Sequence, residues 1–66
     1  MFDKKKFNAA LALKGMCYKD VAEALNIDVS TLWRKMNGVS DFYRNEIQTI
    51  CKFLDLVDPI EIFFAE

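Results

Sequence analysis

Residues 17–38, CYKDVAEALNIDVSTLWRKMNG, constrain the fold of this chain most, because they contain two short amphipathic stretches separated by only a few residues. A helix advances by about 100° per residue, so the side chains on each face can be assigned. Apolar side chains then share one face of each stretch: Val21, Ala22 and Leu25 in the first, and Leu32 and Met36 in the second. The pattern predicts two helices, over about residues 18–25 and 29–36.

The residues between and after these helices favour a tight turn and a defined stop. Asn26 tolerates a left-handed backbone better than most other non-glycine residues. Asp28 can cap the second helix through its carboxylate, and Gly38 can end it. Ala22 is small, as is needed where two helices cross steeply, and Ile27 follows the turn. We therefore expect the two helices to pack across each other.

The outward face of the second helix is polar and basic. It holds Ser30, Thr31, Arg34 and Asn37, with Val29 and Trp33 at its border and Lys35 on the opposite flank. Arg can form paired hydrogen bonds to guanine, Ser can donate or accept, and Val can contact a thymine methyl group. Lys35 and Asn37 suit phosphates, which fix the register of a protein on DNA. The alternative is that this face is only a solvated surface.

The same residues resemble the helix-turn-helix DNA-binding domains of phage repressor and Cro proteins, the lambda-repressor-like or XRE family. The resemblance covers most of the chain. The segment LKGMCYKDVAEALNIDVSTLWRKMNG looks like the family's two-helix motif, and FYRNEI and DPIEIFF are similar to segments of short phage regulators. The resemblance implies a compact bundle of five helices that binds double-stranded DNA in the major groove.

The resemblance also implies roles for individual residues. Family members meet base edges from the start of the second motif helix and one turn further on, which here means Val29, Ser30, Trp33 and Arg34. The residue that opens the first motif helix lies near phosphate, which implies Tyr18, with Lys19 nearby. For Trp33 a second position is open, with the bulky ring across the helix border or against the sugar–phosphate backbone.

The sequence departs from the family pattern at three positions. Asn26 replaces the usual turn glycine, Cys17 stands at a cap more often filled by Ser or Thr, and Tyr43 precedes the next helix where Thr is common. Asn suits the turn, and a missing cap hydroxyl costs only about 1 kcal/mol. We expect the fold to tolerate all three.

The remaining sequence predicts three more helices. Asp3 can cap a first helix, with Phe2 and Phe7 at the spacing of a hydrophobic staple and Gly15 at its end. An apolar stripe predicts a fourth helix: Ile47, Ile50, Cys51 and Leu54. A cap, a first-turn proline and a capping-box acid begin a short last helix: Asp58, Pro59 and Glu61. No strand-like alternation competes, so we predict one all-α domain over residues 1–66.

Charge is divided unevenly along the chain. Residues 1–44 contain eight Lys or Arg and five Asp or Glu, whereas residues 45–66 contain one and five. This asymmetry predicts one basic face and one acidic end. Candidates for the basic face are Lys4, Lys5, Lys6, Lys19, Arg34, Lys35 and Arg44, of which Arg44 is a candidate phosphate contact. The alternative for the three consecutive lysines is an ordinary exposed first turn.

Residues typical of catalytic and metal sites are scarce. There is no His, and two Cys are too few for a structural zinc site. Acidic residues in the second half are attributed to helix starts and solvated surface: Glu46, Asp55, Asp58 and Glu61. We therefore expect no enzyme, cofactor, metal or small-molecule substrate. No signal peptide or hydrophobic span is evident, which favours a reduced cytoplasmic protein without a membrane partner.

The last helix raises the question of self-association. Its apolar residues surround it, and Ile62 and Phe64 are candidate dimer contacts, the alternative being that Phe63 and Phe64 both close the bundle. Two functional classes stay open. One is a sequence-specific transcriptional regulator, a small phage or prophage repressor or Cro-like protein that binds an operator. Regulators of this type that bind two half-sites do so as homodimers. The other is a protein-binding adaptor or antirepressor that retains the same fold.

Overall fold

The computed structural model describes residues 1–65, which form five α-helices and no strand. The helices are α1 (Lys4–Lys14), α2 (Tyr18–Leu25), α3 (Val29–Met36), α4 (Arg44–Phe53) and α5 (Ile60–Phe63). The predicted all-α, five-helix fold is confirmed. The last helix is a single turn, because only four residues of the chain are helical there.

Four of the five helices end on the same left-handed cap. The backbone φ angle is positive at Gly15 (65°), Asn26 (58°), Gly38 (80°) and Asp55 (53°). In each case the next residue donates its N–H to a carbonyl five positions back: Met16 to Leu11, Ile27 to Ala22, Val39 to Arg34 and Leu56 to Cys51, at 2.9–3.0 Å. These are Schellman caps, and each one turns the chain sharply with its last carbonyls satisfied.

The helix starts are capped in different ways. The Asp3 side chain accepts the Lys6 N–H at 3.1 Å, as predicted, and the Phe2 and Phe7 rings pack with centroids 5.2 Å apart, forming the predicted staple. The expected carboxylate cap of Asp28 is wrong. Its side chain makes no capping hydrogen bond, and its backbone carbonyl accepts the Leu32 N–H at 3.1 Å in the first helical hydrogen bond of α3.

The start of α2 shows how the chain manages without a cap hydroxyl at Cys17. The carboxylate of Asp20 accepts the Cys17 backbone N–H at 2.9 Å and the Cys17 thiol at 3.2 Å. The backbone hydrogen bond from Cys17, and after it the thiol, hold the pKa of Asp20 below its usual value. The side chain of Asp20, the third residue of α2, thus supplies the capping contact.

One apolar core joins all five helices. It contains Phe7, Leu11, Val21, Ala22, Leu32, Met36, Ile50, Leu54, Ile62 and Phe63. Helix α2 packs against α3 and α4, and α1 packs against α5. The expectation that Ile62 contributes to a dimer is wrong, because its side chain is 4% exposed within this core. Phe63 is also buried, whereas Phe64 is 55% exposed.

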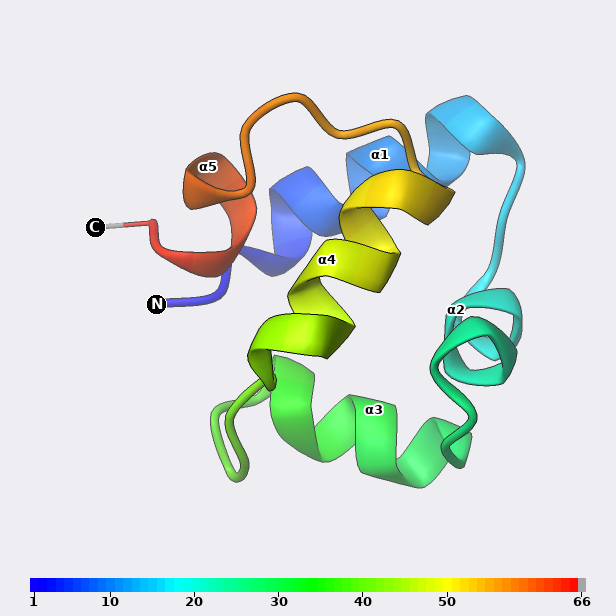
Figure 1. The fold of residues 1–66 in the computed structure, drawn as a ribbon, viewed down its shortest axis with the longest axis vertical. Helices are drawn as coiled ribbons and strands as arrows, with labels where there is room; N and C mark the ends of the chain where they lie inside the picture. The colour runs from blue at the N-terminus through cyan, green and yellow to red at the C-terminus, as the bar shows by residue number, and fades with distance from the viewer. Residues whose placement is uncertain (66) are drawn as a thin grey trace.

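The arrangement leaves α3 at the periphery. Figure 1 shows α3 along the lower edge of the molecule, with α4 rising from it towards α1, a loop returning to α5, and both chain ends beside α5. No other helix covers the outer side of α3 in this view. The fold therefore anchors α3 on its inner face and leaves its outer face free.

Candidate nucleic-acid interface

Helix α3 divides its residues between the core and the surface. Leu32 and Met36 are buried on the inner side. The outer side carries the four residues expected at base edges, all of them exposed: Val29, Ser30, Trp33 and Arg34. Positions three and four apart on a helix are neighbours on its surface, and the pairs 29/33, 30/33 and 30/34 link these four side chains into one continuous face. We call it the reading face.

One flank of the reading face is aromatic. The Tyr18 ring, at the start of α2, lies between Phe7 and Trp33, with centroid distances of 6.2 and 6.5 Å. The Tyr18 hydroxyl donates to the Asn8 side chain of α1. Trp33 is 49% exposed and lies against this row. In the free protein its ring therefore occupies the helix border, one of the two positions left open by the sequence.

The same flank contains a lysine from the first helix. The Lys4 amino group lies 5.3 Å from the centroid of the Trp33 ring. It also donates to Asn37 Oδ1 at 2.8 Å, while Asn37 Nδ2 donates to the Trp33 carbonyl at 2.7 Å. Asn37 is thus exposed and engaged at the end of α3. From the sequence, Lys4 could only be assigned to a general basic face, because nothing local places it beside α3.

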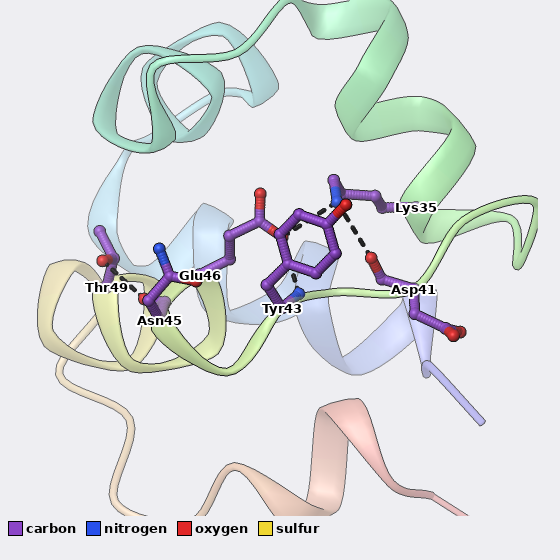
Figure 2. Close-up of polar contacts among 6 residues, drawn as sticks. All are labelled: Lys35, Asp41, Tyr43, Asn45, Glu46 and Thr49. Atoms are coloured by element: carbon purple, nitrogen blue, oxygen red, sulfur yellow. Dashed lines mark hydrogen bonds and ion pairs between the residues drawn. The ribbon is translucent and has the colours of Figure 1, made fainter.

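The opposite flank contains a buried ion pair that the sequence analysis missed. The Lys35 amino group lies 3.0 Å from Glu46 Oε1, and both side chains are less than a tenth exposed. Lys35 also donates to the Asp41 carbonyl at 3.0 Å and lies 4.1 Å from the centroid of the Tyr43 ring. Glu46 Oε1 accepts the Tyr43 backbone N–H at 2.7 Å. Figure 2 shows Lys35 reaching from α3 towards these groups.

This cluster corrects two expectations. Lys35 was expected at a DNA phosphate, but burial, an ion pair and a hydrogen bond commit its amino group to α4 and the preceding loop. Glu46 was attributed to helix-start charge and solvated surface; it does accept the Tyr43 N–H at the start of α4, but it is 7% exposed and not solvated. A signal was present in the sequence: helical spacing already placed Lys35 off the outward face, and Glu46 stands at the third position of α4, where an acid caps the helix.

Other charged residues lie at the ends of the remaining helices. Lys19 and Arg44 are exposed at the starts of α2 and α4, respectively. Asp55 pairs with Lys14 at 2.6 Å, and the hydrogen bond and charge of Lys14 lower the Asp55 pKa. Asp58 Oδ1 accepts the Ile60 N–H at 3.0 Å and so caps α5, with Pro59 rather than Asp58 at the boundary position.

The described residues contain no group suited to a metal ion and no helix suited to a membrane. Within residues 1–65, no three or more His, Cys, Asp or Glu side chains are grouped so that they could hold a metal ion. Over the same range, no helix combines the length and apolar character that crossing a bilayer requires. Burial raises the pKa of the Cys51 thiol, as expected for a small, partly buried apolar side chain.

Two short helices joined by a tight turn, the second anchored on one side and exposed on the other, define a helix-turn-helix unit. The family model of the Cro/C1-type HTH DNA-binding domain matches residues 6–63. Since the match spans most of the chain, the protein belongs to this family, and the resemblance noted from its motifs is confirmed. Neither the curated proteins nor the solved structures contain a match to the chain.

Proposed function

We propose that this protein is a sequence-specific transcriptional regulator, a small phage or prophage repressor or Cro-like protein that binds an operator. The observation that carries the proposal is the exposed reading face of α3 in a member of a DNA-binding family. Arg34 reads guanine through paired hydrogen bonds, Ser30 donates or accepts at a base edge, and Val29 contacts a thymine methyl group. Occupying the operator then blocks a promoter.

Phosphate contacts surround these base contacts. Lys19 and Arg44 stand exposed at the first turns of α2 and α4, where the positive end of each helix also favours an anion. Tyr18 and Asn37 supply polar groups on the Trp33 flank. Lys35 is left out of this set because its amino group is buried against Glu46. Phosphate contacts of this kind fix the register and carry no sequence information directly.

The test is selection of bound duplexes from a randomised DNA pool, with the unaltered protein and with Arg34→Ala. We expect one enriched motif for the unaltered protein, and loss of discrimination worth about 1–3 kcal/mol at one base pair with Arg34→Ala. Lys52→Ala is the matched control, since it removes an exposed cation from the last turn of α4. Retention of the full motif by Arg34→Ala would contradict the assignment of Arg34.

The regulator reads two half-sites as a homodimer. Phe64 is exposed and borders a cleft of about 840 Å³ whose lining includes the apolar side chains of Met1, Phe2, Phe42 and Phe63. An apolar cleft with an exposed aromatic at its rim supports a contact with a second copy. A two-fold symmetric motif in the selected DNA, bound as two chains per duplex, is the expected outcome.

The same cleft also favours a second candidate function, a protein-binding adaptor or antirepressor that keeps the fold. The two candidates differ in one observation. An adaptor gives no enriched DNA motif and binds duplexes only weakly at low salt, with no dependence on Arg34.

A further inference from the structure

We propose that Lys4, from the first helix, is a DNA phosphate contact, and that Trp33 is the positioning residue that places it there. The inference rests on the proposed function, because it extends the DNA interface of α3 to a residue of α1. Its basis is the contact between Lys4, Trp33 and Asn37 on one flank of the reading face.

Three contacts, each depending on the one before, fix the position of the Lys4 amino group. The Trp33 carbonyl accepts Asn37 Nδ2 at 2.7 Å, which orients the Asn37 amide so that its oxygen points away from the helix backbone. That oxygen accepts the Lys4 amino group at 2.8 Å. The Trp33 ring lies beneath the same amino group, 5.3 Å away, where the ring face attracts a cation. An exposed lysine is thereby held beside the recognition helix.

The amino group retains the capacity to bind an anion in this position. A lysine ammonium has three donors, and Asn37 takes one of them. Lys4 is exposed, unlike Lys35, so a phosphate oxygen can reach the other donors without breaking a buried contact.

The position also fits the path of a DNA strand. Tyr18 and Lys4 both lie beside the Trp33 ring, Tyr18 with its ring centroid at 6.5 Å and Lys4 with its amino group at 5.3 Å. Lys19 is the next residue after Tyr18 on α2, and Asn37 contacts Lys4. A phosphate backbone that approaches Trp33 therefore comes close to both Tyr18 and Lys4. In this arrangement the Trp33 ring supports the backbone contact, and Ser30 and Arg34 read the bases.

The test compares Lys4→Ala with Lys6→Ala by salt titration of binding to the selected duplex and to an unrelated duplex. Lys6 is matched in charge and helical turn but lies about 200° around α1 from Lys4. We expect Lys4→Ala to weaken binding to both duplexes roughly three- to tenfold at 50 mM salt and to reduce the salt slope by about 0.9. We expect Lys6→Ala to leave the slope unchanged. Equal effects of the two variants would overturn the inference.

Trp33→Leu tests the positioning role. If the ring seats Lys4, this variant lowers the salt slope as Lys4→Ala does, and the double variant loses little more, because neighbours in one cluster are not additive. An altered motif with an unchanged slope would instead make Trp33 a base contact and overturn its positioning role. Urea denaturation of each variant serves as the control that it is folded.

A second readout is independent of DNA. Trp33 is the only tryptophan, so its fluorescence reports the approach of the Lys4 amino group in the free protein. Emission that shifts in Lys4→Ala and not in Lys6→Ala is expected. Identical emission from the two variants would contradict the contact between the Lys4 amino group and the Trp33 ring. If the unaltered protein binds no duplex, both the proposed function and the phosphate contact are wrong. If it binds normally and the salt slopes of Lys4→Ala and Lys6→Ala are equal, only the phosphate contact of Lys4 is wrong.

Discussion

At the scale of residues, Lys35 and Glu46 show that burial gives a charged side chain a structural role in place of a surface one. Their ion pair at 3.0 Å is supported by the Asp41 carbonyl and the Tyr43 backbone N–H, so each charged group has hydrogen-bonding partners. Removing two charges from water is costly, and a buried pair often contributes little net stability. What the pair does determine is the position of the end of α3 relative to the start of α4.

Removing one partner of this ion pair should strongly destabilise the fold. Glu46→Ala leaves the Lys35 charge buried without its partner and also removes the acceptor of the Tyr43 N–H, so we expect a loss of about 3–5 kcal/mol in the free energy of unfolding. The double variant Lys35→Met/Glu46→Leu should lose much less, since no buried charge remains and only the Tyr43 N–H and the Asp41 carbonyl are left without a protein partner. Urea denaturation measures both, with Glu61→Ala as an exposed control. A single variant no less stable than the double variant would contradict this account.

At the scale of elements, the helix ends were predictable and the contacts between helices were not. Gly15, Asn26 and Gly38 are residue types that accept a left-handed backbone, and each ends a helix as expected. Their conformation is local, so the sequence carries it. The Lys35–Glu46 pair joins two elements across a loop, and its burial depends on how α3 and α4 pack. Asp55 is exposed, as expected, but its residue type did not predict the left-handed backbone with which it ends α4.

The turn between α2 and α3 gives a direct test at this scale. Asn26 has a φ of 58°, a conformation that costs most residues with a Cβ roughly 1–2 kcal/mol and glycine nothing. Asn26→Ala should therefore lower the free energy of unfolding by about 1 kcal/mol, while Asn26→Gly should leave it nearly unchanged. Chemical denaturation of the two variants measures the difference. Equal stability of the Ala and Gly variants would show that the turn relaxes away from the left-handed conformation.

At the scale of the whole molecule, the short last helix closes the core. Phe63 packs against Phe2 and Phe42 with centroid distances of 5.4 and 5.2 Å, and the Ile62 carbonyl accepts the Asp3 N–H at 2.7 Å. The two ends of the described chain are thereby joined through side chains and backbone. The sequence could not decide which aromatic faces inward, because apolar residues surround a helix of only four residues.

The two neighbouring phenylalanines should therefore differ sharply. A chain of 66 residues has a free energy of unfolding of roughly 3–10 kcal/mol, and truncating a buried phenylalanine costs about 3–5 kcal/mol. Phe63→Ala should consume much or all of the stability. Phe64→Ala should change it by no more than about 0.5 kcal/mol, because its side chain is largely exposed. Thermal unfolding followed by circular dichroism separates the two, and similar melting temperatures would contradict this assignment of the core.

The buried pair also restricts how this sequence can diverge. Replacing only Lys35 or only Glu46 by an apolar residue leaves the other charge buried without its partner, while replacing both does not. The residue types allowed at the two positions therefore depend on each other. Exposed residues of the reading face carry no such constraint and can change one at a time. The outer face of α3 can therefore vary in sequence while the contact that holds α3 against α4 stays fixed.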